Sequence, residues 1–496
     1  MRVRLPRPFS LLLVCLMSFA ACSGEQERIV LRFLPWQEDY DFVGPLIIKY
    51  EHEHPGVEIR MLRAAEQNET LKTLLASGEP PDVFAIDVEL FPAYHAVGAL
   101  APLDGHLEGT DFDESDYYPI TLDAFRARGS DGRARLYALP KDCTPYVLYY
   151  NRQLFLEKGV EPPDESWTWE DLERAAIALC GPKDERGLRG SYGLSMNYWS
   201  QALMPWIWSS GGAVFDQDGR CVIDSPETIR ALAFLRRLFD LGVTTGRVSP
   251  DAIRSARMSF EQGRVAMVAP AGRWVVNRVR DRNPALDFDV APLPRGPSGQ
   301  RFTALAETGY CLSSASRHPG AAAEFLRFLA GEEGAWLMAE RGIAVPAVRQ
   351  VAEGPAFLDP GRPPATDRVF LDELERARLN PTRQGWAEIK QIIREAVEDC
   401  LVTGRLSPEA ACRQARSRIE ALLERSRTRE RAPPFPLGIS AGLLALVLLS
   451  CLLLFLWMQR SRVPEERSER RAALLFLSPW ALGFGLFLAV PVLVTL

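Results

Sequence analysis

Residues 28–88 decide the fold, and they read RIVLRFLPWQEDYDFVGPLIIKYEHEHPGVEIRMLRAAEQNETLKTLLASGEPPDVFAIDV. Short β-rich runs alternate here with segments whose apolar residues recur near helical spacing. The predicted strands are 28–36, 57–64 and 83–88, and the predicted helices are 39–56 and 68–82. Strands and helices that alternate at such short spacing predict a doubly wound α/β layer.

Polar and aromatic residues follow two of these predicted strands. Trp36 ends the first strand and Gln37 and Glu38 follow it, while Asp87 is the next-to-last residue of the third strand and Glu89 follows that strand. Ligands of such sheets bind beyond the carboxyl ends of the strands, so these residues are expected on one rim. The two acidic residues are equally well explained as charges at a helix N-terminus, which the helix dipole favours.

The bulk properties of the chain exclude several function classes. Its 496 residues are enough for two to four structural units, and 47% hydrophobic and 25% charged residues are typical of a folded protein. A net charge of −6 with both signs interspersed offers no basic face for nucleic acid. His52 and His54 lie two positions apart and share no helical face, so no metal site is expected. No GxxxxGK[ST] motif is present, so ATP hydrolysis would need a partner, and no cofactor is expected.

The first 22 residues are predicted to be an export signal. Three arginines precede the short apolar run FSLLLVCLMSFAA at 9–21, which is shorter than a membrane span. The run ends at Cys22, and this ending resembles a bacterial lipobox, in which the cysteine is lipidated. The alternative is an ordinary cleaved signal with a chance cysteine. In the exported body an oxidising compartment permits disulfides, and buried free thiols are an equally good reading of its six cysteines. These are Cys143, Cys180, Cys221, Cys311, Cys400 and Cys412.

The body of the chain resembles the family 1 extracellular solute-binding proteins, the sugar- and maltose-type receptors of ABC importers. The resemblance begins with residues 28–107 and continues in order through five further motifs. These are LYALPKDCTPYVLYYNRQLFLEKGVEPPDESWTWEDL at 136–172, SSGGAVFDQDG at 209–219, SFEQGRVAMVAPAGRW at 259–274, the segment 321–348, and the segment 385–423. It implies a solute-binding domain over 28–425, with two α/β lobes and a hinged cleft that closes on the solute. The implied lobes are 28–142 with 287–345, and 143–282 with 346–425.

The resemblance also implies ligand-binding residues. Trp274 matches the aromatic residue of a family turn, Trp386 matches a second stacking aromatic residue, and Tyr150 matches a tyrosine of the cleft. Thr144 lies by the implied crossover between lobes. Trp208 is as well explained by the core as by the cleft, and each of the other tryptophans has the same structural alternative.

Two departures from the family pattern bear on the ligand. Arg273 replaces the usual proline before the tryptophan, which suggests a charged or acidic sugar, and Glu307 stands where a small glycine-rich turn is usual. With Trp36, Asp87 and Glu89, these complete the predicted binding set. Carboxylates such as Asp87 and Glu307 could also serve a glycoside hydrolase, but carboxylates in a sugar cleft bind hydroxyls equally well, so no enzyme is expected.

The C-terminal part is predicted to enter the membrane. Residues 426–436 form a charged, then proline-rich linker, and 437–457 are apolar over a length that spans a bilayer. An arginine-rich loop at 458–471 suits the cytoplasmic side. Residues 472–496 are apolar again and resemble the first membrane helix of a maltose-type sugar ABC permease, through Pro479 and Gly483. The fold class expected is thus a two-lobed binding protein followed by two transmembrane helices, with the permease continuing beyond Leu496; a vestigial second span is the alternative.

The function expected from the resemblance is the substrate-binding component of a carbohydrate ABC importer, fused to its permease at the cell membrane. Its binding domain would face outward, and its partners would be a second permease subunit and cytoplasmic ATPase subunits. The alternative is a membrane-anchored solute sensor or scaffold that uses the same binding fold.

Overall fold

A computed structural model of the chain describes residues 28–129, 131–182, 185, 189–198, 200–245, 260–381, 383 and 385–431. By internal contacts the chain divides into two units, Met1–Leu422 and Leu423–Leu496, and the fold below is that of the first. Among the described helices, none is long and apolar enough to cross a membrane. The predicted signal with Cys22, the linker beyond 431 and both predicted spans lie outside the described residues.

The first sheet has six strands and begins with the stretch that opened the sequence analysis. β1 (Ile29–Leu34), β2 (Val57–Met61) and β3 (Val83–Asp87) run parallel, with β1 in the middle. Between them come α2 (Tyr40–Glu53) and α3 (Gln67–Ala76). The predicted doubly wound layer is therefore confirmed. The sheet continues from β3 to β11 (Thr303–Leu312), and β11 also pairs with β6 (Ala138–Pro145) and β12 (Ala377–Arg378).

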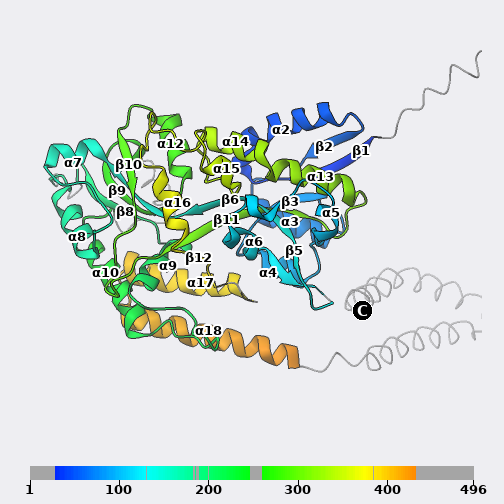
Figure 1. The fold of residues 1–496 in the computed structure, drawn as a ribbon. Helices are drawn as coiled ribbons and strands as arrows, with labels where there is room; N and C mark the ends of the chain where they lie inside the picture. The colour runs from blue at the N-terminus through cyan, green and yellow to red at the C-terminus, as the bar shows by residue number, and fades with distance from the viewer. Residues whose placement is uncertain are drawn as a thin grey trace, which may run out of the picture. The chain divides into compact units, whose positions relative to one another are not determined.

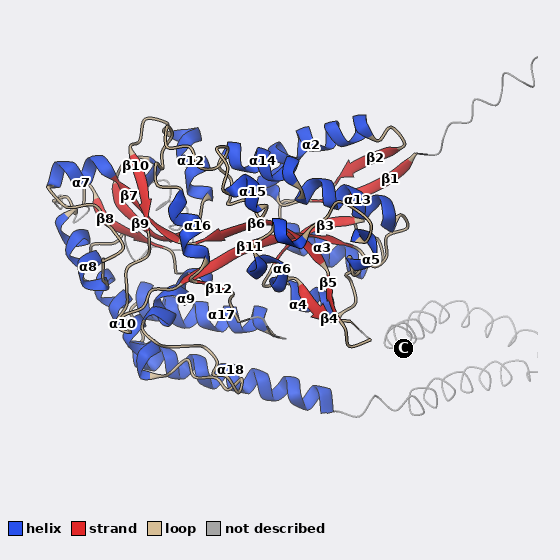
Figure 2. Cartoon of the chain, in the orientation of Figure 1, coloured by secondary structure: helices blue, strands red, loops and turns tan. Residues whose placement is uncertain are grey.

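A second sheet of four strands forms the core of the second lobe (Figure 1). Its order is β10 (Phe288–Ala291), β7 (Val147–Asn151), β9 (Val265–Ala271) and β8 (Tyr192–Met196). Only one residue, Tyr146, separates β6 of the first sheet from β7 of the second. Figure 2 shows β6 and β11 as long strands that lead from one sheet toward the other.

The return to the first lobe occurs later than the sequence suggested. The expected return segment begins at residue 287, but β10 pairs with β7 in the second sheet, with Phe288 opposite Asn151 and Ala291 opposite Leu148. The first sheet takes up the chain only at β11. The resemblance did not fix this register, because a strand's partner depends on backbone pairing that sequence spacing does not reveal.

The remaining described elements surround the two sheets. The helices are α4 (Phe91–Ala96), α5 (Asp104–Leu107), α6 (Pro119–Ala124), α7 (Arg152–Lys158), α8 (Trp169–Ala178), α9 (Ser200–Ser209), α10 (Pro226–Asp240), α12 (Trp274–Arg282), α13 (Pro319–Ala330), α14 (Glu332–Arg341), α15 (Arg349–Ala352), α16 (Arg368–Leu374), α17 (Trp386–Val397) and α18 (Pro408–Arg431). Short 3-10 helices lie at Gln37–Asp39 (η1) and Glu114–Asp116 (η2), a π-helix at Glu398–Val402 (η3), and a small hairpin pairs β4 (Arg126–Arg128) with β5 (Ala134–Leu136).

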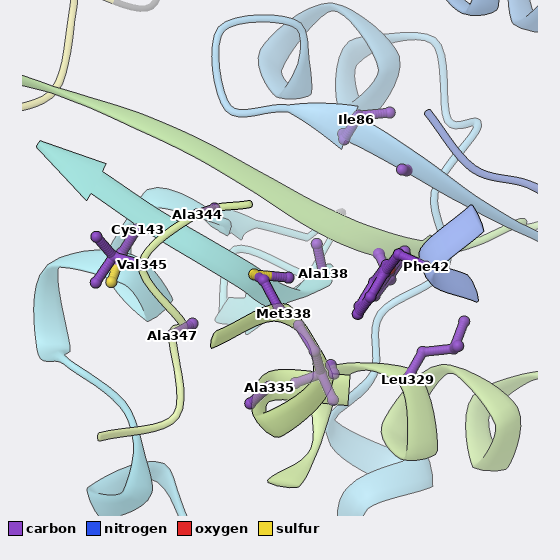
Figure 3. Packing of buried hydrophobic residues seen from close by; sticks show 14 of the residues in the cluster. Phe42, Ile86, Ala138, Cys143, Leu329, Ala335, Met338, Ala344, Val345 and Ala347 are labelled. Carbon is purple, nitrogen blue, oxygen red and sulfur yellow. The ribbon is translucent and has the colours of Figure 1, made fainter. Parts of the chain in front are cut away.

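The core of the first lobe is built by helices that press small and apolar side chains onto the sheet. Figure 3 shows Ala335 and Met338 of α14 close to Ala138 of β6, with Phe42 of α2 nearby. Phe42 and Met338 are each only 1% exposed. Because α14 presents alanines where it meets the sheet, its backbone approaches closely, and this packing stabilises the floor on which β6 and β11 lie.

None of the six cysteines of the body forms a disulfide with another described residue. Cys143, Cys180, Cys221, Cys311, Cys400 and Cys412 are all free, and all but Cys180 are buried. The reading as buried free thiols is the one that the structure bears out.

Candidate functional site: a polar pocket between the lobes

A pocket of about 290 Å³ opens where the carboxyl ends of β1 and β3 meet the middle of β6 and β11. The second lobe contributes Gln201 of α9, and Trp274 and Arg278 of α12, so the pocket lies between the two lobes. The lining residues are Trp36, Asp39, Asp87, Lys141, Asp142, Thr144, Gln201, Trp274, Arg278, Ala306, Glu307, Thr308, Ile343 and Ala344.

The structure brings five of the predicted ligand-binding residues together in this pocket. They are Trp36, Asp87, Thr144, Trp274 and Glu307. The rim expected beyond β1 and β3 is therefore real, because Trp36 and Asp87, from two strand ends, line one cavity. Their role in binding stays a prediction.

Trp274 provides an apolar plane on the side of the second lobe. It is half-buried at the start of α12, and its ring stands edge-on to Tyr146, with centroids 5.6 Å apart and planes at 90°. The ring lies against Gly272, where an added Cβ would come within 2.2 Å of the indole. The Gly272 carbonyl in turn accepts a 2.8 Å hydrogen bond from the Tyr149 hydroxyl. Glycine is thus required for the ring to lie in this position.

A buried lysine organises the acidic floor of the pocket. The ammonium of Lys141 lies 2.7 Å from a carboxylate oxygen of Asp39 and 3.3 Å from one of Asp142. Burial alone would lower the pKa of Lys141, but the two carboxylates outweigh it and the pKa is raised. Lys141 therefore stays charged. The other oxygen of Asp142 accepts a 3.1 Å hydrogen bond from the backbone N–H of Thr308.

Glu307 differs from Asp39 and Asp142 because its carboxyl group has no hydrogen-bond partner among the described residues. Both of its carboxyl oxygens are buried without a hydrogen bond to any described residue, and Glu307 as a whole is only 2% exposed. Burial, and then the charge of Asp142, raise the pKa of Glu307 well above its ordinary value. A protonated carboxyl both donates and accepts hydrogen bonds, so Glu307 can serve a hydroxyl group in either sense.

Two further carboxyl groups of the pocket have raised pKa values. Burial, and then the charge of Glu89, raise the pKa of Asp87 to about 7. Burial also raises the pKa of Asp142 to about 6, although Lys141 opposes the shift. The pocket thus holds carboxyl groups that exchange protons near neutral pH, beside one lysine that does not.

Arg273 requires a correction. It is 1% exposed, and its guanidinium makes two hydrogen bonds of 2.9 and 2.7 Å to the carboxylate of Asp367. It also lies 4.4 Å from the ring centroid of Phe357. Since its charge is balanced inside the protein and it does not line the pocket, the argument for an acidic sugar loses its basis.

Four other predicted ligand-binding residues lie outside the pocket lining. Glu89 is 6% exposed, and its carboxylate binds Asn380, at 2.7 Å, and Lys390. Tyr150, on β7, packs edge-on against Phe155 of α7 at 5.3 Å. Trp208 and Trp386 are 7% and 3% exposed. A tryptophan matched to a family motif can still be a packing residue, because the motif does not report which face of the helix is covered.

Several pocket residues were missed from the sequence. Asp39 and Lys141 are 102 positions apart and meet only because the fold brings Lys141 of β6 to the end of η1. Gln201 was also missed; it lines the pocket while its side-chain oxygen accepts a 2.9 Å hydrogen bond from the Tyr146 hydroxyl. The only available signal was the position of Lys141 and Asp142 close before Thr144, at the implied crossover.

Comparisons with known proteins agree with this architecture. Residues 36–336 match the model of the family described as "Bacterial extracellular solute-binding protein". A binding protein of Brucella abortus is 25% identical over 382 residues, which cover 76% of this chain and 88% of that protein. The galactooligosaccharide-binding protein of Bacillus subtilis is 22% identical over 427 residues, covering 80% and 92%.

Solved structures give the same fold. An ABC substrate-binding protein of Listeria monocytogenes, in complex with cycloalternan, superposes with a TM-score of 0.71 at 24% identity. The match covers 80% of this chain and 99% of that one. Because the family model spans more than half of the chain and the two-lobed α/β fold is shared, this chain belongs to the bacterial extracellular solute-binding protein family.

Proposed function

We propose that this chain is the carbohydrate-binding component of an ABC importer and that it binds its sugar in the pocket between the lobes. One observation carries the proposal: the half-buried indole of Trp274 lines the same cavity as the unpartnered carboxyl group of Glu307. A pyranose needs an apolar plane for its C–H face and fixed polar groups for its hydroxyls. Relatives named as binding galactooligosaccharides and multiple sugars support the same ligand class.

The charges of the pocket favour a neutral sugar over an acidic one. Four carboxyl groups line the cavity, those of Asp39, Asp87, Asp142 and Glu307, against two basic side chains, Lys141 and Arg278. Lys141 already contacts two of the carboxylates. With Glu307 protonated and Asp87 only partly ionised near pH 7, the negative and positive charges of the pocket nearly balance, so no excess positive charge is left to bind a ligand carboxylate. Hydroxyl groups can instead donate to the carboxylates and accept from the protonated Glu307.

The direct test is a binding screen with the full chain in a detergent that has no sugar headgroup. Thermal-shift measurements with mono-, di- and oligosaccharides should identify a stabilising ligand, which calorimetry then confirms. Acidic sugars should shift the melting temperature less than their neutral counterparts. If amino acids or peptides stabilise the protein and no carbohydrate does, the proposed ligand class is wrong.

The membrane arrangement is part of the proposal. Cys22 carries lipid, residues 437–457 cross the membrane, and residues 472–496 begin a permease joined to the binding domain. The helix α18 runs to Arg431 and so takes up the first six residues of the predicted linker at 426–436. At about 3.1 Å per extended residue, the remaining five would reach roughly 15 Å, which confines the binding domain to the outer mouth of the transporter. Cys22→Ala should abolish incorporation of labelled fatty acid while the protein stays in the membrane fraction; unchanged labelling would remove the lipoprotein assignment.

Tethering distinguishes an importer from a sensor. In cells that carry the partner permease and ATPase subunits, uptake by the full-length protein should be insensitive to added free binding domain. Deleting most of 426–436 should abolish uptake and leave ligand binding intact. Uptake that rises in proportion to added free binding domain would instead favour the sensor or scaffold function.

A further inference from the structure

Glu89 makes two polar side-chain contacts outside the pocket, with Asn380 and with Lys390. One carboxylate oxygen accepts a 2.7 Å hydrogen bond from the side-chain amide of Asn380, and the other pairs with the ammonium of Lys390. Glu89 and Asn380 are 6% and 3% exposed, while the Lys390 side chain is 27% exposed. Glu89 was predicted to bind ligand, but both of its oxygens are already engaged by the protein.

We propose that Lys390 closes on Glu89 as an interlobe clasp while Asn380 holds the Glu89 carboxylate in place, and that this clasp positions the lobes for ligand binding without touching the ligand. The inference rests on the proposed function of the pocket for its effect on affinity. Its effect on lobe closure stands independently, because the contact is present without reference to any ligand.

The clasp joins elements of different lobes. Glu89 lies two residues beyond the end of β3, a strand of the six-stranded sheet. Lys390 lies on α17, which packs against α9, and α9 in turn contacts β9 of the four-stranded sheet. Ile393, one turn beyond Lys390, lines a small apolar cavity together with residues of α9 and α10. α17 is therefore fastened to the second lobe, and its Lys390 reaches Glu89 of the first.

The contact is energetically suited to favour closure. A buried carboxylate is costly unless charge-assisted hydrogen bonds compensate it, and Glu89 receives one donor for each oxygen. Without Lys390, the Glu89 carboxylate in the closed form keeps only its hydrogen bond from Asn380. In an open form, with the lobes separated, water would solvate the same carboxylate. Loss of the clasp thus shifts the equilibrium toward the open form, and a ligand that binds the closed form must then supply that free energy.

The clasp also borders the pocket. Asp87 lines the cavity two residues before Glu89, and the charges of both Glu89 and Lys390 contribute to the shifted pKa of Asp87. The position of α17 and the electrostatics of the pocket rim are therefore linked through three neighbouring charged groups.

The experiment measures lobe separation and affinity in the full chain. Spin labels are attached to unnatural amino acids at Ile48 of α2 and Leu156 of α7, which are 71% and 83% exposed. Pulsed electron–electron double resonance then measures the distance between the two lobes. The variants are Glu89→Gln, Lys390→Met and the milder Asn380→Ala. Lys49→Met is the matched control, since Lys49 pairs with Glu333 within the first lobe.

Without ligand, Glu89→Gln and Lys390→Met should each lengthen the distance distribution, and Lys49→Met should not. With the sugar found by the binding screen, the Kd of each single variant should rise about tenfold. This loss of affinity is smaller than that usually caused by breaking a fully buried ion pair, because the Lys390 side chain is partly exposed. The double variant should weaken binding no more than either single variant, because both remove one contact.

Different failures are distinguishable. If no carbohydrate binds the parent protein, the proposed function fails, but the ligand-free distances still test the clasp. Unchanged distances in Glu89→Gln, Lys390→Met and Asn380→Ala would overturn it. Loss of affinity in Glu89→Gln alone, with normal binding by Lys390→Met, would mean that Glu89 contacts the ligand directly, and would overturn it too. If Glu89→Gln and Lys390→Met do not fold, Lys390→Gln, which removes the charge but keeps a polar side chain, decides by the same distances.

Discussion

Replacing Asp87 with asparagine should stabilise the protein at alkaline pH. Burial, and then the charge of Glu89, raise the pKa of Asp87 from 3.8 to about 7. An acid whose pKa is higher in the folded state stabilises that state fully below pH 4. This contribution is lost as the pH rises toward 7, because the unfolded chain gives up the proton first. Asparagine resembles the neutral form and has no proton to lose.

The size of the effect follows from the two pKa values. One unit of pKa difference corresponds to about 1.4 kcal/mol, so the step from 3.8 to about 7 amounts to about 4 kcal/mol. The free energies of unfolding of Asp87→Asn and the parent should be similar at pH 4. The variant should become progressively more stable than the parent above that pH, with the full difference at pH 8.

Urea unfolding of the full chain, followed by circular dichroism at pH 4, 6 and 8, measures this difference. Asp123→Asn removes a carboxylate whose side chain is 74% exposed and serves as the control; its pH dependence should follow that of the parent. A difference between Asp87→Asn and the parent that does not grow with pH would refute the reasoning, because Asp87 would then ionise as readily in the folded as in the unfolded protein.

Four further substitutions test the pocket and its surroundings. Gly272→Ala should displace the indole of Trp274, since the new Cβ would lie 2.2 Å from it, and calorimetry should show weaker sugar binding in a folded protein. Trp274→Ala should lose the stacking contribution of about 0.5–1.5 kcal/mol with a small change in melting temperature, whereas Trp386→Ala, buried in packing, should cost about 3–5 kcal/mol of stability; the reverse pattern would restore Trp386 as a ligand contact. Arg273→Met should destabilise the fold by about 3–5 kcal/mol in urea unfolding by leaving the Asp367 carboxylate unpaired, and should leave the Kd of the folded fraction unchanged.

The sequence predicted what depends on local patterns. The alternation over 28–88 revealed the doubly wound layer and the rim where Trp36 and Asp87 meet, because both follow from strand ends that the pattern itself marks. The roles of Arg273 and Glu89 depend instead on distant partners. Asp367 is 94 positions from Arg273, and Lys390 is 301 positions from Glu89.

The acidic floor of the pocket was beyond sequence reasoning for the same reason. Nothing near Lys141 in the chain indicates that Asp39 is its partner, and the pair forms only when the fold brings β6, paired with β11, to the end of η1. A charged residue in an unusual motif position is therefore ambiguous until its counter-charge is known. It can face the ligand or balance a charge inside the protein.

The buried thiols give this protein a set of native reporters. Cys143 and Cys311 are fully buried, and burial raises the pKa of each thiol well above its ordinary value, so alkylating reagents meet neither an accessible nor an ionised sulfur. Cys143 lies on β6 and Cys311 on β11, the two strands that carry the chain between the lobes. Mass spectrometry of pulse-alkylated protein would therefore time the separation of these strands during unfolding, with no engineered label.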